Sequence, residues 1–308
     1  MQSLLLDWFA RNGRDLPWRR TRDPYRVLVS EIMLQQIQVA RAIPFYEAFV
    51  ERFATVEALA AAALADVIRV WKDLGRYRRI VYLHRTANIV VADFGGSVPD
   101  DPAVLRTLPG VGPYTAGAIA CFAYELDVAF VDTNMKRVLH RVVLGPERLE
   151  RPAKDAELLE LAARLLPTSR AWRWNSALMD LGATVCKARN PACGTCPLRT
   201  ACRSAAEFLS GRASPIAVRK TPPYRFEESD RFYRGRVLAT LRSLGDDGAD
   251  PSGIDLRDLG RAIRGDFQDE HLDWLGGLVR GLSKDGLAVL NEERPVYDAE
   301  PVARVKLP

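Results

Sequence analysis

The chain has few of the residues that build disulfide frameworks, histidine metal sites or membrane spans. Its 308 residues include five cysteines and three histidines, and no apolar run approaches the roughly 18 to 20 residues that cross a bilayer. The first residues lack the basic and then apolar layout of a secretory signal, and clustered cysteines do not fit a secreted disulfide framework. We therefore expect a cytoplasmic protein with no membrane association.

Acidic residues are fewer than basic residues in the first two thirds of the chain. Residues 1–225 hold 32 Lys and Arg against 22 Asp and Glu, whereas residues 226–308 hold 12 against 17. A basic surface suits a polyanion such as DNA, although a merely well-solvated surface explains the charge equally well. If the partner is DNA, the first part of the chain is expected to bind it.

The pattern of residues 1–205 predicts a mostly α fold without strand alternation. Asp23 stands directly before Pro24, an arrangement typical of a helix start, because the acid caps free amides and the proline fits the first turn. One further helix is expected to span the region from Val56 to Trp71, and another is expected to begin at Pro113.

The last third of the chain predicts a separate small domain. Residues 206–225 are interrupted by glycine and prolines, as in a linker. Residues 231–243, 256–263 and 270–283 have helical periodicity, and the segments KDGLAVL and VARVKL can pair as a hairpin. Three helices and a hairpin indicate a winged-helix-like domain over residues 226–308.

Four cysteines can close around one soft inorganic centre. Cys186, Cys193, Cys196 and Cys202 are separated by six, two and five residues. Zinc sites usually pair two short Cys-x-x-Cys knuckles, whereas one short knuckle between two longer steps favours a 4Fe-4S cluster. The fifth, Cys121, lies in the apolar run IACFAY and is expected in the core.

The segment LPGVGPYTAG predicts a tight turn that opens a helix. Gly110 and Gly112 flank Val111, and Pro113 suits the first helical position. Such a turn lets backbone amides approach phosphate closely, and it serves equally as a helix-helix turn without a ligand.

Together with the runs DLGATVC, FVDTNMKRVLHR and LPWRRTRDPYRVLVSEIMLQQIQVA, the turn and cysteine loop resemble the MutY-type adenine DNA glycosylases of the helix-hairpin-helix endonuclease III superfamily. The resemblance covers about residues 1–205, and the tail resembles that of actinobacterial members. It implies a two-lobed helix-hairpin-helix core with a 4Fe-4S loop. The implied partner is double-stranded DNA with adenine mispaired with 8-oxoguanine or guanine, and the implied product is an abasic site.

The resemblance also implies catalytic roles. Asp132, supported by Asn134, would stabilise or trap the positive charge that builds on the sugar. Glu31, on an apolar helix, would have a raised pKa and protonate the leaving purine. Simple helix capping by Asp132 and an exposed surface position for Glu31 are the alternatives. Tyr114 replaces the Schiff-base lysine of endonuclease III, which implies no efficient strand cleavage.

Further residues carry over to DNA contacts. Arg14 and Trp18 resemble the wall of the flipped-base pocket, with a plain core position as the alternative for Trp18. Gln36 resembles a residue wedged into the duplex, and Lys187 and Arg189 suit phosphate.

Two positions depart from the family pattern. Arg76 replaces an aromatic residue beside the opposite base, and Ser176 replaces a glutamine or glutamate that faces adenine. The Nudix-like tail common in the family is also missing from the sequence pattern.

Two other functions stay open. A thymine or uracil mismatch glycosylase would share the turn, Asp132 and the cluster, but the presence of Glu31 argues against it. A non-catalytic DNA-binding iron-sulfur redox sensor would have no use for both carboxylates. A monomer associated with the nucleoid is expected in either enzymatic case.

Overall fold

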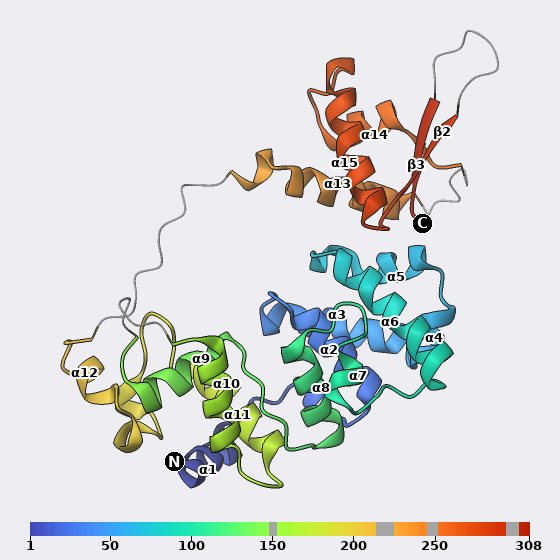
Figure 1. Ribbon diagram of the computed structural model, residues 1–308. Coiled ribbons are helices and arrows are strands. Elements are labelled where there is room, and N and C mark those ends of the chain that lie inside the picture. The colour runs from blue at the N-terminus through green and yellow to red at the C-terminus, as the bar shows by residue number, and fades with distance from the viewer. Residues whose placement is uncertain (148–152, 214–224, 245–251, 294–301) are drawn as a thin grey trace. The chain divides into compact units, whose positions relative to one another are not determined.

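The computed structural model describes residues 1–147, 153–213, 225–244, 252–293 and 302–308 (Figure 1). Within these ranges the chain forms helices and, near its C-terminus, three strands. It divides into two compact units, Met1–Glu31 with Val98–Lys220 and Ile32–Ser97 with Thr221–Pro308. None of the helices in the described ranges combines the length and the apolar character that a bilayer span requires.

The first unit consists of helices and short helical turns. They are α1 (Gln2–Asn12), η1 (Pro17–Arg19), most of α2 (Pro24–Leu34), α7 (Pro102–Leu105), α8 (Pro113–Tyr124), α9 (Thr133–Leu139), the π-helical turn η3 (His140–Leu144), α10 (Asp155–Leu165), α11 (Ala171–Thr184), η4 (Cys193–Thr195), η5 (Arg199–Ala201) and α12 (Ala205–Leu209). The predicted starts at Pro24 and Pro113 are confirmed. The Asp23 carboxylate accepts a hydrogen bond of 2.9 Å from the amide of Tyr25, as a cap should.

The core of this unit lies where α8, α9 and α11 meet. Trp174, Leu178 and Phe130 are almost completely buried there, and Cys121 is buried beside them, as predicted for a core thiol. Close approach of the helices depends on Gly182 of α11, since a Cβ there would come within 2.7 Å of the Asn134 Cβ. The run DLGATVC therefore sets the distance between α11 and the start of α9.

The second unit begins with the last residues of α2 and continues through α3 (Val39–Arg52), α4 (Val56–Ala61), α5 (Leu64–Trp71), η2 (Lys72–Leu74) and α6 (Arg78–Phe94). The prediction of one helix from Val56 to Trp71 was wrong. Ala62 and Ala63 are extended, with ψ of 144° and 137°. This break lets both short helices pack against α6, and the Ala62 carbonyl lies 2.9 Å from His84 Nε2.

The C-terminal module of the second unit contains η6 (Phe226–Glu228), α13 (Asp230–Ser243), β1 (Ile254–Asp255), α14 (Leu256–Ile263), η7 (Asp269–His271), α15 (Leu272–Lys284), β2 (Val289–Glu293) and β3 (Val302–Lys306). The three predicted helices and the pairing of β2 with β3 are confirmed, with Leu290 opposite Val305. The third strand, β1, was not predicted because two residues show no alternation. The sheet order is β1-β3-β2, antiparallel throughout.

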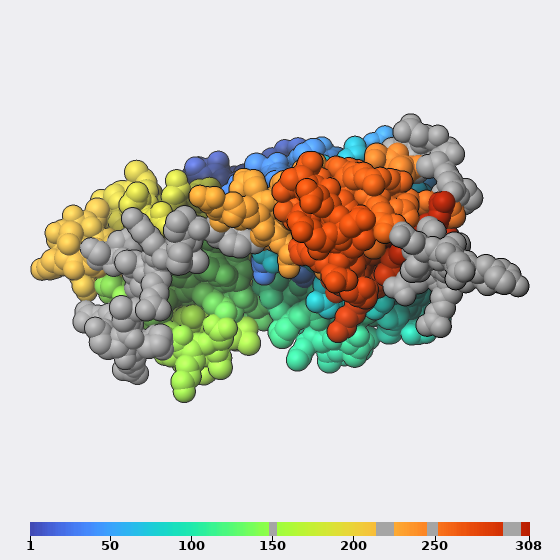
Figure 2. All heavy atoms as spheres, turned by 90° about the horizontal axis from the view of Figure 1, so that it is seen from above, coloured from blue at the N-terminus to red at the C-terminus, as the bar shows by residue number. Residues whose placement is uncertain are grey.

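The heavy atoms of this module are coloured orange to red in the space-filling view (Figure 2). Its relation to winged-helix proteins stays a prediction, as do the domain boundaries at 205 and 225. Residues 214–224 of the predicted linker lie outside the described residues.

Candidate active site and cysteine pocket

Glu31 lies on the inner face of α2 and is only 4% exposed. Its neighbours along the helix, Leu28 and Ile32, are buried as well. The pKa of Glu31 is raised from 4.5 to about 7, because burial, together with the charge of Asp132, outweighs a hydrogen bond from the Tyr114 hydroxyl and the charge of Arg19. The predicted buried carboxyl is thus present, and its burial favours the protonated form.

Tyr114 connects the glycine turn to Glu31. It follows Pro113 at the start of α8, and its ring packs edge-on against Phe130 with centroids 5.5 Å apart. Burial first, and then the charges of the two carboxylates, raise the pKa of Tyr114 well above its usual range. The phenol therefore stays protonated and donates to Glu31.

The turn before α8 has the predicted conformation. Gly110 has φ of +77°, where a side chain would be strained. The Val111 side chain is buried, and its amide donates to the Leu108 carbonyl at 3.2 Å. The turn therefore presents backbone rather than side chains between α7 and α8, with Gly112 as the residue before the helix.

Asp132 caps α9 and is also part of the carboxylate pair. Its Oδ1 accepts from the Met135 amide at 2.7 Å and its Oδ2 accepts from the Asn134 side chain at 3.2 Å. Burial raises the pKa of Asp132 although these hydrogen bonds oppose the rise. Capping and a position near Glu31 therefore coexist, because the same carboxylate interacts with both the helix start and Glu31.

Arg137 links the start of α9 to the cysteine loop. Its Nη2 donates to Asn134 Oδ1 and to the Gly182 carbonyl, each at 2.7 Å, and its Nε donates to the Cys186 carbonyl at 2.7 Å. Asn134, which donates to Asp132, is therefore held by Arg137, and the same arginine holds the backbone of Cys186.

A buried ion-pair network organises the predicted base-pocket segment. Asp180 of α11, with 0% exposure, accepts from Arg14 Nε at 2.7 Å and from both terminal nitrogens of Arg19 at 2.8 and 3.0 Å. Burial disfavours the charge of Asp180, yet the two arginines outweigh it and lower its pKa. Trp18, between the arginines in sequence, is 8% exposed.

Gln36 and Arg76 are exposed residues at two turns of the second unit. Both have positive φ, 61° and 53°. The buried Arg79 ties these turns together, since its Nη1 donates to the Gln35 carbonyl at 2.7 Å and its Nε to the Arg76 carbonyl at 3.3 Å. The two residues predicted to meet the duplex thus share one support.

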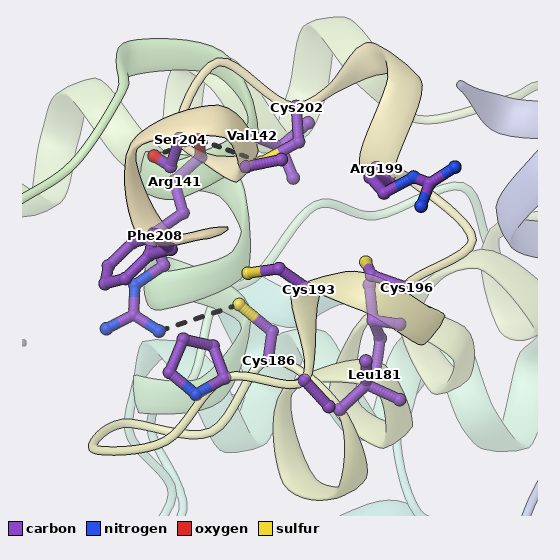
Figure 3. A pocket seen from close by; sticks show the side chains of 14 residues that line it. Arg141, Val142, Leu181, Cys186, Cys193, Cys196, Arg199, Cys202, Ser204 and Phe208 are labelled. Carbon is purple, nitrogen blue, oxygen red and sulfur yellow. Dashed lines mark hydrogen bonds between the residues drawn. The ribbon is translucent and has the colours of Figure 1, made fainter. Parts of the chain in front are cut away.

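All four clustered cysteines line one pocket (Figure 3). Arg141 of the π-helical turn, which is 2% exposed, lies 3.8 Å through its Nη1 from Cys186 Sγ and donates to the carbonyls of Lys187 and Ala188. The Phe208 ring covers the guanidinium at 4.8 Å from its centroid. Among the described residues, no three His, Cys, Asp or Glu side chains converge on a position for a single metal ion. Four thiols around a shared pocket, with the buried cation of Arg141 beside them, suit an anionic polynuclear cluster.

Other predicted residues lie at the margins of these sites. Lys187 and Arg189 are exposed on the cysteine loop. Ser176 is completely buried in α11, and its hydroxyl has no hydrogen-bond partner among the described residues. The rings of His140 and His84 contact backbone carbonyls, those of Gly145 at 3.0 Å and of Ala62 at 2.9 Å.

Sequence reasoning did not assign a supporting role to the buried and half-buried charged residues that hold the site, namely Arg19, Arg79, Arg137, Arg141 and Asp180. Asp180 lies within the run DLGATVC, and a charged residue between apolar helix positions was the one available signal. No such signal marks the arginines, because the chain has 44 lysines and arginines and many of them could pair with a given acid.

Two family models match the chain. The model of the HhH-GPD superfamily base excision DNA repair proteins matches residues 29–164. The model of the iron-sulfur binding domain of endonuclease III matches residues 186–202, from the first to the last clustered cysteine. The pocket is accordingly a 4Fe-4S site.

Curated relatives carry the name adenine DNA glycosylase. The protein of Mycolicibacterium smegmatis is 44% identical over 239 residues, which cover 77% of this chain and 79% of the relative. The rat protein is 40% identical over 222 residues, which cover 69% of this chain and 43% of the relative.

Solved structures share the fold. A thermostable thymine-DNA glycosylase is 32% identical with a TM-score of 0.62, and the likeness covers 67% of this chain and 94% of that one. A non-covalent endonuclease III-DNA complex is 22% identical with a TM-score of 0.59, covering 68% and 95%.

Proposed function

Because the chain belongs to the adenine DNA glycosylase family, within the HhH-GPD superfamily of base excision DNA repair proteins, we propose that it releases adenine mispaired with 8-oxoguanine or guanine and leaves an abasic site. One observation carries the proposal. A buried carboxyl with a pKa of about 7, Glu31, lies beside a second carboxyl, Asp132, and both interact with Tyr114.

Glu31 is suited to act as the general acid. A leaving purine departs more easily when a ring nitrogen is protonated, and the best catalytic acid has a pKa near the working pH. The Tyr114 hydroxyl donates to Glu31 and thereby orients the carboxyl, so that the proton resides on the oxygen left for the base.

Asp132 is suited to stabilise the sugar. Loss of the base leaves positive charge on the deoxyribose, which a nearby carboxylate stabilises or captures until water attacks the anomeric carbon. Asn134 donates to Asp132 at 3.2 Å and is itself held by Arg137, which fixes the carboxylate before the substrate arrives. Without an amine at residue 114, the protein is expected to leave the strand intact.

The remaining contacts concern the duplex. The backbone around Gly110 and Gly112 would receive a phosphate, Gln36 and Arg76 would enter near the opposite base, and Arg14 with Trp18 would border the extruded adenine.

The cysteine loop would present its basic residues to the DNA backbone. When bound to Cys186, Cys193, Cys196 and Cys202, the cluster ties the loop together, and the exposed Lys187 and Arg189 then face phosphates. We further propose that the protein works as a monomer in the cytoplasm, on the nucleoid.

A second candidate is the release of thymine or uracil. The likeness to a thymine-DNA glycosylase at 32% identity favours it. The buried Glu31 favours adenine instead, because an extruded purine offers a ring nitrogen that a carboxylic acid can protonate.

Duplexes with single mispairs, followed by heating in alkali, test both candidates. We expect cleavage at adenine opposite guanine or 8-oxoguanine, and none at thymine or uracil opposite guanine. Glu31→Gln should reduce adenine release by about 10²- to 10⁴-fold, the usual contribution of an acid catalyst, whereas Glu47→Gln, an exposed change on α3, should not. Release of a pyrimidine would overturn the adenine proposal, and no release from any duplex by the cluster-loaded protein would favour the non-catalytic sensor.

A further inference from the structure

The loop between α5 and α6, residues 72–77, has an unusual backbone. Lys72, Gly75 and Arg76 have φ of 46°, 79° and 53°. Left-handed backbone is unfavourable for residues that carry a Cβ, and such conformations persist where their surroundings hold them. The 72–77 loop therefore depends on contacts made by other segments.

Some of this support comes from neighbouring helices. Trp71 Nε1 donates to the Gly75 carbonyl at 3.0 Å, and Arg79 donates to the carbonyls of Gly75 and Arg76, each at 3.3 Å. Arg41 donates to the Asp73 carbonyl. These bonds hold the carbonyls of Asp73, Gly75 and Arg76 and leave the Lys72 carbonyl to another partner.

The partner of Lys72 is Arg242, from α13 of the C-terminal module. Its Nη1 donates to the Lys72 carbonyl at 2.9 Å and lies 3.3 Å from the Tyr77 hydroxyl, and its Nη2 pairs with the Asp73 carboxylate. The Arg242 side chain is only 12% exposed. One guanidinium thus contacts the first two residues and the last residue of the loop.

A second contact joins the same two segments. Asp285, after α15, pairs with Arg78 of α6 at 3.3 Å and with Arg234 of α13. Gly286 follows with φ of +73°, and a Cβ there would lie 3.4 Å from Val81 Cγ1. The segments Ile32–Ser97 and Thr221–Pro308 accordingly form one compact unit.

Charge argues against direct DNA binding as the main role of the module. Residues 226–308 hold 12 basic against 17 acidic residues, so the module as a whole repels phosphate. The Arg242 side chain is largely covered, whereas the basic residues Lys72 and Arg76 of the loop itself are exposed.

We propose that the C-terminal module acts as a positioning element, in which Arg242 holds the 72–77 loop so that Arg76 meets the duplex. The inference rests on the proposed function in naming DNA as the ligand of Arg76. Arg242 is a positioning residue, because it acts through the loop and not on the DNA.

Hydrogen exchange of the full, cluster-loaded protein tests the structural half without DNA. Arg242→Gln should speed exchange of the amides of residues 72–77 by about tenfold, as expected when a local contact is lost, and Asp73→Asn should speed it in the same segment. The matched control is Arg236→Gln, an equal charge change at an exposed position of α13 whose side chain donates to Ala262 within the module. Exchange in both variants equal to this control would overturn the proposal.

Binding to a duplex with adenine opposite guanine tests the second half. Arg242→Gln and Arg76→Ala should each raise Kd by about tenfold, and the double variant should bind no worse than Arg76→Ala alone, because residues acting as one unit are not additive. Arg242→Lys keeps the charge beside Asp73 and should recover part of the affinity. Additive losses would overturn the proposal, since Arg242 would then act independently of Arg76. If the amides of residues 72–77 exchange slowly in the parent protein and faster in the Arg242 variant, but the protein releases no base, the proposed function is refuted and the positioning role of Arg242 is not.

Discussion

Glu31→Gln is expected to slow base release strongly and, above pH 4.5, to be more stable than the parent protein. Burial raises the pKa of Glu31 from 4.5 to about 7, which makes ionisation in the folded protein unfavourable by about 3 kcal/mol relative to the unfolded chain. Glutamine has nearly the same shape and bears no charge. The variant therefore avoids the free-energy cost that the ionised Glu31 imposes on the fold.

The pH dependence of this difference follows from proton binding. Between pH 4.5 and about 7 the folded protein retains the Glu31 proton while the unfolded chain loses it, so the stability of the parent protein falls as pH rises through this window. The free energy of unfolding of Glu31→Gln minus that of the parent should grow over the same window. At pH values above the pKa of Glu31 in the folded protein, this difference should stay constant at about 3 kcal/mol.

Urea unfolding of the cluster-loaded proteins at pH 5, 6, 7 and 8 measures the difference. Glu47→Gln, on the exposed face of α3, serves as the control and should follow the parent at each pH. A Glu31→Gln variant whose stability relative to the parent does not change with pH would refute a raised pKa at Glu31. The proposed general acid would lose its physical basis with it.

Three further predictions concern the surroundings of the carboxylates and the cluster. Asp180→Asn leaves two guanidiniums without their buried counter-charge and should lower the free energy of unfolding by about 3–5 kcal/mol at pH 7, measured in urea. Because ionisation of Asp180 is favoured in the folded state, the stability difference between parent and variant should shrink as pH falls. Tyr114→Phe removes the hydrogen bond that lowers the pKa of Glu31, so the alkaline fall in single-turnover base release should move to higher pH, and an unchanged or more acidic limb would contradict the assigned contact. Arg141→Met removes the cation beside Cys186 and should speed loss of visible cluster absorbance under a chelator by about 10- to 100-fold, the usual effect of losing a partner of a metal ligand, with exposed Arg189→Met as the control.

Local signals predicted the helix starts, and the absence of such signals explains the error at residue 62. Asp23 with Pro24, and Gly112 with Pro113, mark starts through bonds that span a few residues. The break at Ala62 lies in an alanine-rich run with neither glycine nor proline, and it results from packing against α6. Local patterns do not contain that information.

The candidate site divides in the same way. Glu31 and Asp132 stand in recognisable runs and were predicted. The network around Asp180 was not, because Arg19 precedes Asp180 by 161 positions in the chain and Arg14 precedes it by 166. Such pairs depend on how α11 packs against the segment before α2. The arginine-rich composition gives each acid many possible partners, and the fold alone selects among them.

The helix α9 and the π-helical turn form one continuous helical segment from Thr133 to Leu144. It is about 18 Å long at roughly 1.5 Å per residue. Asp132, the carboxylate proposed to stabilise the sugar, caps one end, and Arg141, which lies 3.8 Å from Cys186 Sγ, projects near the other. Damage by oxygen at the iron end would therefore disturb the chemistry at the far end without altering either carboxyl. A preparation that bleaches in air should lose base release in parallel with its brown colour.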